Sequence, residues 1–297
     1  MGAKIVNYGS MNYDYTYQVD HMVRPGETLA SRGRTVHCGG KGFNQSVALA
    51  RAGVQVRHAG MLGTDGERFL EEMEKQGIDT CCVRRTGEVC GHAVIQVNPE
   101  GENCILLYEG SNGQNTEAQI RQVLDTMEAG DWLLLQNEIN LTDRVIDLAW
   151  EKGIRIVWNP SPYNEKAAAC HMEKVSVFLI NETEGEQLTG RTEPDAILEE
   201  MERRCPGCEV VLTLGAEGVV WGCGGRRIQV PAYRVKAVDT TAAGDTFTGY
   251  YLAAVLEGAD RETALRRGCA ASALAVQKEG AAASIPSREE VDRFFCS

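Results

Sequence analysis

The chain has 297 residues, enough for one large α/β domain or two small ones. Hydrophobic residues make up 43% and charged residues 24% of the sequence, which are ordinary proportions for a soluble globular protein. The formal net charge of -12 argues against nucleic acid and anionic membranes as partners, because both reward clustered Lys and Arg. A bound phosphate would therefore have to be held largely by backbone N–H groups.

The beginning of the sequence runs directly into a strand-like segment. MGAKIVNYGS lacks the charged region and the long apolar run of a signal peptide. No stretch of the chain approaches the roughly 18 apolar residues of a membrane span. We therefore expect a cytoplasmic protein that does not interact with a membrane.

Two segments have the pattern of exposed β-strands. Residues 12–36 alternate polar and apolar side chains around a Pro-Gly pair. Residues 91–109 form two β-rich runs joined by the turn sequence NPEG at 98–101, which predicts a hairpin. Together they predict a small β-sheet that projects from the main body as a lid.

From about residue 118, short apolar runs alternate with stretches of helical spacing. The apolar runs with strand character are 132–138, 155–160, 177–181 and 209–215, and further helices are expected at about 245–257, 260–277 and 287–295. This alternation is typical of βαβ units and a parallel sheet, and the wholly apolar strands indicate helices on both faces. We expect one α/β domain over residues 1–297, into which the lid segments 12–36 and 91–109 are inserted.

Eleven cysteines is a high number for this length, but the count is odd and several lie in apolar runs. We expect reduced thiols that act as small core residues, with Cys104 and Cys269 as examples. Cys205 and Cys208 form a CxxC pair between a charged helix and a strand. A zinc site would need a second pair at suitable spacing, and the sequence contains none, so we assign this pair no function.

Asp245 is a lone carboxylate at the beginning of an apolar helix, behind the loop TTAAG at 240–244. A helix N-terminus offers unpaired N–H groups and a positive dipole end, and a loop without bulky side chains lets a phosphate approach its backbone. A carboxylate beside that phosphate is well placed to take a proton from an attacking hydroxyl. The alternative, an Asp that merely caps the helix, is equally consistent with the sequence.

The stretch HCGGKGFNQSVALARAG at 37–53 contains a glycine-rich turn that opens a helix. It nearly matches the dinucleotide-binding fingerprint, but Gln45 replaces the third glycine, and no P-loop motif occurs elsewhere. Lys41 and Asn44 are polar groups in this turn that could bind a hydroxylated ligand. By itself this motif is a weak signal.

Acidic residues also follow two of the expected strands. Glu138 comes after WLLLQN, and Asn181 with Glu184 comes after VFLI. Ligands of open parallel sheets bind at the carboxyl ends of the strands, and Mg²⁺ favours a few carboxylates with several waters. Helix capping by Asn181 is the alternative explanation, and without other observations it is the better one.

Taken in order, these motifs resemble the ribokinase-like (PfkB) sugar kinases over essentially the whole chain. GSMNYD at 9–14 looks like the substrate-binding first strand of that family, GGKGFNQ at 39–45 like its glycine-rich signature, NETE at 181–184 like its NxxE motif, and DTTAAGDTF at 239–247 like its C-terminal signature. The resemblance implies a three-layer α/β/α fold with a mostly parallel central sheet and a small β-sheet lid. It also implies ATP-dependent phosphorylation of the primary hydroxyl of a small sugar, with D-ribose as the first expectation.

The resemblance further assigns roles to individual residues. Asp245 would be the general base, and Ala242, Ala243 and Gly244 would form an anion hole for the transferred phosphoryl group. The sugar would be held by Asn12, Asp14, Gly39, Gly40, Lys41, Asn44, Glu138 and Asp245. ATP would contact Asn181, Glu184, Thr213, Gly215, Gly218, Gly244 and Cys269. Glu184 would bind Mg²⁺ through water, and a monovalent cation such as K⁺ would lie among Asp239, Thr241, Ala275, Gly280 and Ser284.

Two lid residues depart from the family pattern and leave the substrate open. His92 and Gln96 stand where apolar residues are usual, and Gln96 would change specificity if it pointed at the sugar. A kinase for another sugar, a sugar acid or a nucleoside is therefore the first alternative. A non-catalytic sugar or nucleotide sensor on the same fold is a further alternative. The presence of Asp245 argues against it, because a sensor does not need a catalytic base. The lid strands of such kinases often pair between subunits, so we expect a homodimer.

Overall fold

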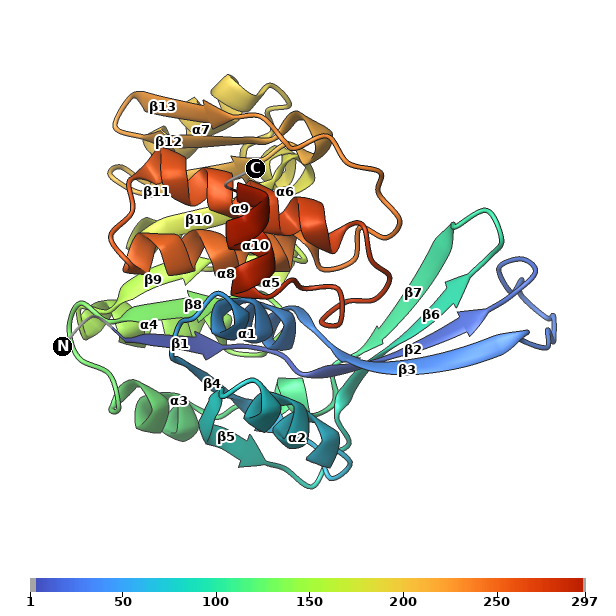
Figure 1. The fold of residues 1–297 in the computed structure, drawn as a ribbon. Helices are drawn as coiled ribbons and strands as arrows, with labels where there is room; N and C mark the ends of the chain where they lie inside the picture. The colour runs from blue at the N-terminus through green and yellow to red at the C-terminus, as the bar shows by residue number, and fades with distance from the viewer. Residues whose placement is uncertain (1–3, 296–297) are drawn as a thin grey trace.

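The computed structural model describes residues 4–295, so both ends of the expected 1–297 domain, residues 1–3 and 296–297, lie outside the described residues. Its large sheet has nine strands in the order β13-β12-β11-β10-β9-β8-β1-β4-β5 (Figure 1). The strands are parallel from β5 to β11, and β12 and β13 are antiparallel additions at one edge. Their bounds are β1 Ile5–Tyr8, β4 Val56–Leu62, β5 Asp79–Arg85, β8 Trp132–Leu135, β9 Arg155–Trp158, β10 Val177–Asn181, β11 Glu209–Thr213, β12 Val219–Cys223 and β13 Arg226–Val230.

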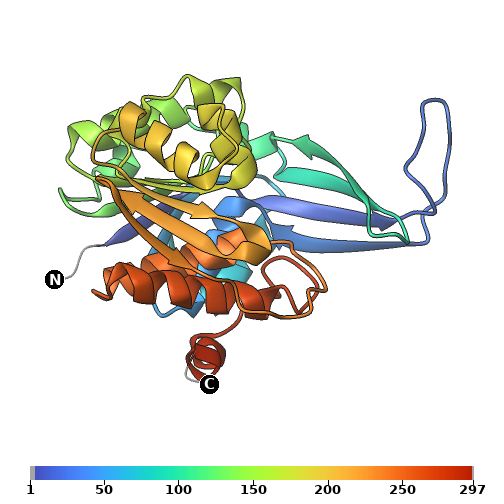
Figure 2. The same cartoon turned by 90° about the horizontal axis from the view of Figure 1, so that it is seen from above.

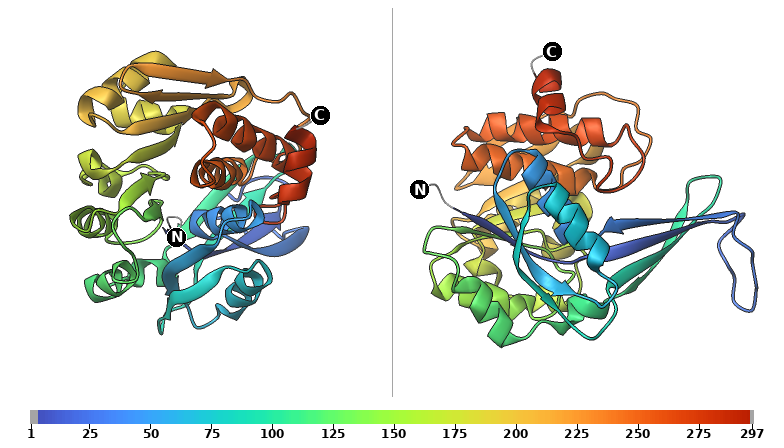
Figure 3. Two further views of the ribbon diagram at one scale, coloured as in Figure 1. Left: turned by 60° about the vertical axis from the view of Figure 1, so that its left-hand side comes forward. Right: turned by 60° about the horizontal axis from the view of Figure 1, so that its bottom comes forward.

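Helices cover both faces of this sheet, as Figure 3 shows. One face carries α1 Lys41–Arg51, α2 Glu67–Lys75, α8 Ala243–Leu256, α9 Arg261–Ala275 and α10 Arg288–Phe295. The other carries α3 Glu117–Leu124, α4 Thr142–Glu151, α5 Glu165–Ala168, α6 Glu182–Thr189 and α7 Pro194–Arg204, and short 3₁₀ turns lie at Gly110–Gln114, Met172–Lys174 and Gly215–Glu217. The expected three-layer α/β/α arrangement with a mostly parallel sheet is therefore confirmed.

The apolar strands supply two separate cores. Alternate residues of a strand point to opposite faces, so Leu134 of β8 belongs to the core that includes α8, while Leu133 and Leu135 belong to the core that includes α3 and α4. Each expected strand ends at or before its expected limit, because the residues that follow leave the sheet. β8, for example, ends at Leu135 rather than at residue 138. These departing residues line the site described below.

A second sheet projects from the body, as Figures 1 and 2 show. Its strands lie in the order β3-β2-β6-β7, with bounds β2 Asn12–Gln18, β3 Gly33–Gly39, β6 Gly91–Val97 and β7 Asn103–Tyr108. The hairpin expected at 98–101 is confirmed, because β6 and β7 are antiparallel neighbours on either side of it. We call these four strands the small sheet.

Two glycines allow the close approaches that shape the site. A Cβ atom on Gly249 of α8 would lie 2.3 Å from the Cβ atom of Ala48, so glycine lets α8 pack directly against α1. A Cβ atom on Gly42 would lie 2.3 Å from the backbone nitrogen of Ser10, so the start of α1 lies directly against the chain that leaves β1. Residues more than 200 positions apart are thereby brought into contact.

The cysteines follow the sequence expectation only in part. The ten within residues 4–295 are free thiols, and Cys205, Cys208 and Cys269 are buried. Cys104, in contrast, is exposed on β7, so its assignment to a core was wrong. The reason is that β7 is the edge strand of the small sheet, and all six of its residues are exposed. No helix within residues 4–295 has the length and apolar character needed to cross a membrane.

Candidate active site

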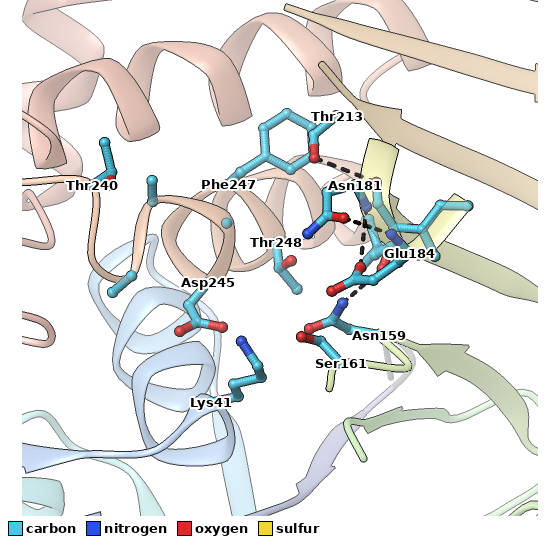
Figure 4. Close-up of a pocket in the computed structure, with 15 residues that line it drawn as sticks. Lys41, Asn159, Ser161, Asn181, Glu184, Thr213, Thr240, Asp245, Phe247 and Thr248 are labelled. Atoms are coloured by element: carbon cyan, nitrogen blue, oxygen red, sulfur yellow. Dashed lines mark hydrogen bonds between the residues drawn. The ribbon is translucent and has the colours of Figure 1, made fainter. Parts of the chain in front are cut away.

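Two cavities adjoin at the carboxyl ends of β10 and β11, beneath the N-terminus of α8. The first, of about 210 Å³, is lined by Lys41, Asn159, Ser161, Glu184 and Asp245, among other residues (Figure 4). The second, of about 480 Å³, is lined largely by small and apolar residues between α9 and the segment that follows β13. They share a wall made by Asn181, Thr213, Thr240, Ala243, Gly244 and Phe247. A ligand of two parts could therefore span both.

Asp245 lies in the first turn of α8, with 7% of its surface exposed. The capping alternative is wrong, because the N-cap of α8 is Ala242 and the carboxylate of Asp245 is held by other residues. Oδ2 accepts a hydrogen bond from Asn44 Nδ2 at 3.0 Å, and Oδ1 accepts one from Gln45 Nε2 at 2.9 Å. Both donors belong to α1, which the contact between Ala48 and Gly249 holds against α8.

The N-terminus of α8 faces the shared wall of the two cavities. Ala242 has φ 59°, a left-handed conformation that glycine adopts more readily, and it turns the chain into the helix. The first N–H groups of a helix have no partner within it, which makes this terminus suited to an anion. One of them, the N–H of Ala243, donates to the carbonyl of Thr240 at 3.2 Å. Ala242, Ala243 and Gly244 line the first cavity, and their role as an anion hole stays a prediction.

Further acids lie near Asp245, where the polar residues that follow β1 and β8 meet. Oε2 of Glu138 accepts hydrogen bonds from Ser10 Oγ and from the backbone nitrogen of Lys41. Asp14 of β2 lies beside Gly39, where a Cβ atom would be 2.1 Å from the Asp14 carboxylate. Both glycine and the register of β2 and β3 are thus needed to place this acid.

Electrostatics couple these acids to one another. Burial, followed by repulsion from Glu138 and Asp245, raises the pKa of Asp14 to about 7. Burial likewise raises the pKa of Glu138, in spite of the nearby Lys41 ammonium. Burial lowers the pKa of Lys41, but Asp245, Glu138 and Glu184 outweigh it and hold the pKa above its ordinary value. The site therefore contains one permanent cation among several acids, and Figure 4 shows the Lys41 side chain directed toward Asp245.

Asn12 and Asn44, which were also expected at the sugar, differ in whether their amide oxygens have a hydrogen-bond partner. Asn12 is buried, and its Oδ1 accepts a hydrogen bond from Asn112 Nδ2 at 2.7 Å. Asn44 is also buried, and its Oδ1 has no partner within the described residues. An unpaired buried oxygen costs free energy, so this atom is suited to accept a hydrogen bond from a ligand. Gly40 has φ 89° and forms the N-cap of α1 between these groups.

The motif at 181–184 is a helix cap as well as a cavity wall. Asn181 Oδ1 accepts from the backbone nitrogen of Glu184, and Glu184 Oε2 accepts from that of Asn181, which is a capping box. The capping alternative is thus observed. It also fixes the Glu184 carboxylate on the wall of the first cavity, opposite Asp245. A buried carboxylate oxygen of this kind suits Mg²⁺, directly or through water.

The second cavity contains the remaining residues that were expected at the nucleotide. Gly215 and Gly218 have φ 52° and 111°, and a Cβ atom on Gly218 would lie 2.1 Å from the carbonyl oxygen of Val230. Cys269 is 6% exposed and belongs to the apolar core while it also lines the cavity. Burial raises the pKa of its thiol to about 12, so it is a small apolar wall residue rather than a reactive group. Thr213 lines both cavities.

The expected cation residues gather where the loop before α8 meets the loop after α9. Asp239 accepts hydrogen bonds from the backbone nitrogens of Thr241 and Gly280, both at 2.9 Å. These bonds outweigh the effect of burial and hold the pKa of Asp239 below its ordinary value. The hydroxyl of Ser284 donates to the Ala281 carbonyl, and the Ala275 carbonyl accepts from Lys278. Asp239 thus joins the loop before α8 to the loop after α9, and the binding of a monovalent cation there stays a prediction.

The pairing of β6 with β2 shows which face of the small sheet carries His92 and Gln96. In the register of the small sheet Ala93 pairs with Asp14, whereas His92 and Gln96 pair with Tyr13 and Tyr17. Neighbours in a strand point to opposite faces, so both residues lie on the face away from Asp14. There Gln96 accepts a hydrogen bond from the backbone nitrogen of Val23. The alternation of residues 91–97 marked two faces, but only the pairing with β2 shows which of them meets the acids.

Several residues of the site had not been predicted. They are Ser10, Gln45, Asn159, Ser161, Thr248 and Asn112, which contribute hydrogen bonds or line the first cavity. Lys41, which was expected at the sugar, lines the first cavity together with Asp245 and Glu184. Ser10 and Asn159 follow β1 and β9, so the rule that ligands bind at the carboxyl ends of parallel strands could have found them.

Fold and site together define a kinase for small hydroxylated substrates, and comparison with known proteins identifies the class. The sequence pattern of the pfkB family carbohydrate kinases matches residues 3–288, and the chain belongs to this family. Ribokinase from Haemophilus influenzae is 36% identical over 296 residues, which cover 97% of this chain and 96% of that protein. The expected family and enzyme class, a carbohydrate kinase, are thus confirmed.

Solved structures lead to the same fold. The crystal structure of ribokinase from Thermotoga maritima has a TM-score of 0.89 at 32% identity and covers 99% of this chain and 100% of that one. Arabidopsis thaliana ribokinase complexed with ribose and ATP has a TM-score of 0.87 at 27% identity, with 99% of each chain covered. The expected ribokinase-like fold, with its small additional sheet, is therefore confirmed.

Proposed function

We propose that this protein transfers the γ-phosphoryl group of ATP to the primary hydroxyl of a small sugar. D-ribose is the first candidate for that sugar. The observation that carries the proposal is the position of Asp245. Its carboxylate lines the first cavity at the N-terminus of α8, close enough to Asp14 to raise the pKa of that acid, and two amides of α1 fix it there. The similarity to ribokinases, one of them complexed with ribose and ATP, supports ribose and ATP as the substrates.

In this proposal Asp245 accepts the proton of the sugar hydroxyl as that oxygen attacks the γ-phosphorus. Asp14, Glu138 and Asn12 orient the remaining hydroxyls together with the backbone of Gly39 and Gly40. Asn44 donates to Asp245 and offers its unpaired Oδ1 to the substrate. Holding the hydroxyl beside both base and phosphate accounts for a large part of the rate of such transfers.

Charge that develops on the phosphoryl oxygens would be stabilised by the backbone N–H groups at Ala242–Gly244 and by the Lys41 ammonium. The nucleotide would lie in the larger cavity, with its base against apolar wall residues such as Cys269 and its phosphates toward Thr213, Gly215 and Asn181. Glu184 would hold Mg²⁺, which when bound neutralises phosphate charge. The cation residues around Asp239 would keep the loop before α8 in place when K⁺ is bound.

We further propose that the chain is a single kinase domain with the segments 12–36 and 91–109 inserted as a lid. The small sheet would close over the sugar through the face of Asp14 and Ala93 and exclude water. We propose a homodimer that covers β7, since Ile105, Leu106, Leu107 and Tyr108 are all exposed apolar residues there, Leu106 to 71%. Exposed apolar residues that gather on an edge strand are suited to an interface.

An assay of ADP release tests the proposed function. Purified protein is given Mg·ATP, K⁺ and one of ribose, 2-deoxyribose, fructose, arabinose, ketodeoxygluconate, adenosine or pseudouridine. Preference for ribose supports the first choice, and preference for another compound assigns the enzyme to that substrate within the same chemistry. Silence across the panel would favour a sugar or nucleotide sensor.

The role of Asp245 has its own test. Asp245→Asn keeps the shape of the side chain but removes the base, so kcat should fall by about three orders of magnitude while ATP affinity changes little. Turnover is measured under saturating substrates, and ATP affinity by fluorescence or calorimetry. Near-normal turnover in this variant would remove Asp245 from the mechanism.

A further inference from the structure

A series of buried side-chain amides connects the central sheet to Asp245. Asn7 of β1 donates from Nδ2 to the carbonyl of Gly42 at 2.7 Å. Gln136, which follows β8, donates from Nε2 to Asn7 Oδ1 at 2.9 Å and to Gln45 Oε1 at 2.7 Å. Gln45 in turn donates from Nε2 to Asp245 Oδ1 at 2.9 Å. We call Asn7, Gln136 and Gln45 the amide chain.

The direction of every bond in the amide chain is fixed by its first member. The Gly42 carbonyl can only accept, so Asn7 must present Nδ2 to it and Oδ1 to Gln136. Gln136 must therefore present Nε2, and its second hydrogen goes to Oε1 of Gln45. Gln45 is left with Nε2 toward Asp245, which is the orientation an ionised carboxylate requires.

A second anchor fixes the same amide from another strand. Asn159, which follows β9, donates from Nδ2 to the Leu179 carbonyl at 2.8 Å, so its Oδ1 must face Gln45. Gln45 Nε2 lies 3.2 Å from that oxygen. The two hydrogens of Gln45 Nε2 are thus shared between Asn159 and Asp245, and the side chain has no freedom to rotate.

The amide chain is sealed from solvent. Asn7 and Gln45 are 0% exposed and Gln136 is 1% exposed. Buried polar groups without partners are costly, so each bond of the amide chain fixes the orientation of the next side chain. Gln136 Oε1 has no partner within the described residues. Burying three primary amides in the middle of an α/β sheet needs a reason beyond stability, since apolar residues of similar size would pack there without a hydrogen-bond requirement.

We propose that Gln45 is a positioning residue for the proposed general base, and that Gln136 and Asn7 act through it. The amide chain transmits the rigid geometry of β1, β8 and β9 to the Asp245 carboxylate and keeps Oδ1 engaged. Oδ2, which also accepts a hydrogen bond from Asn44, then meets the substrate hydroxyl in one orientation. This inference rests on the proposed function of Asp245, and a displacement of about 1 Å at such a group costs about 100-fold in rate.

The test uses Gln45→Met, which keeps the length of the side chain and removes both hydrogen-bonding groups. With Mg·ATP, K⁺ and the panel sugar that the wild type turns over fastest, we expect kcat to fall about 10- to 100-fold while KM for both substrates stays within about threefold. Gln136→Met, one step further away, should lower kcat about 3- to 10-fold. If Gln45→Met does not fold, Gln136→Met decides.

Ser46→Ala is the matched control. Ser46 is on the same helix, is 0% exposed and binds Asn7 and His58, but it lies outside the amide chain. It should lower the unfolding temperature to a similar extent as Gln45→Met and leave kcat within about twofold, because Gly42 still orients Asn7. Equal losses of kcat in the control and in Gln45→Met would overturn the proposal.

The Asp245→Asn background separates this inference from the proposed function. If Gln45 acts through Asp245, adding Gln45→Met to Asp245→Asn should lower the residual rate of ³²P transfer from labelled ATP by less than about twofold. A full additional loss would mean that Gln45 acts elsewhere, and a wild-type kcat in Gln45→Met would also refute its role. High turnover in Asp245→Asn alone would instead refute the function of Asp245.

Discussion

Asp14 allows a quantitative test of the sugar site. Burial and the nearby acids Glu138 and Asp245 raise its pKa to about 7, so its carboxyl group changes charge within the physiological range. An ionised carboxylate accepts hydrogen bonds from sugar hydroxyls more strongly than a protonated one. With a pKa of about 7 the ionised fraction rises from roughly 0.1 at pH 6 to roughly 0.9 at pH 8. Sugar affinity should therefore increase about tenfold across this range.

The ionisation of Asp14 affects the stability of the ligand-free protein in the opposite direction to its effect on sugar affinity. The folded protein holds the proton of Asp14 more tightly than the unfolded chain, whose ordinary value is 3.8. Its contribution to the free energy of unfolding is fully present below that value and is lost as pH rises through about 7. The ligand-free protein should thus lose stability as pH rises from 3.8 to about 7, with little further change above that.

Isothermal calorimetry with ribose in the absence of ATP measures the affinity at pH 6, 7 and 8. Asp14→Asn serves as the control, because it cannot ionise and should bind weakly with little dependence on pH. Glu138→Gln removes the repulsion between Glu138 and Asp14. The pKa of Asp14, and with it the pH at which sugar affinity rises, should therefore be lower in that variant. A flat profile in the wild type, or an unchanged slope in Asp14→Asn, would refute the reasoning.

Two further predictions concern the cation residues and the small sheet. Replacing K⁺ by Na⁺ should lower kcat, because the carbonyl-rich loops around Asp239 and Gly280 would hold the smaller ion less well; equal rates in the two salts would count against this site. Leu106→Glu should convert the dimer into a monomer, because it would bury a charge in the proposed interface. Light scattering measures the mass of both proteins, and a monomeric wild type would contradict the assignment of β7 to an interface.

Much of the fold follows from local patterns. The apolar runs of β8 to β11, the helices between them and the hairpin at 98–101 are set by the period of hydrophobic residues and by turn chemistry, which neighbouring residues determine. The acid at the start of α8 and the motif at 181–184 are also local, because a helix N-terminus is recognisable from a few residues. Their position at the carboxyl ends of the strands, where parallel sheets usually bind ligands, also follows from the sequence.

The sequence alone thus predicted the fold class, which is confirmed, and it named the acids Glu138, Glu184 and Asp245, which the structure brings around Lys41. The tertiary structure decided which groups touch. Gln45 and Asp245 are 200 positions apart, and their contact depends on the close packing of α1 on α8 and on the adjacency of β1 and β8. The alternation in β6 likewise separated two faces, but its pairing with β2 turned His92 and Gln96 away from Asp14. Periodicity records how a segment is buried, whereas contacts between distant segments depend on how whole elements pack.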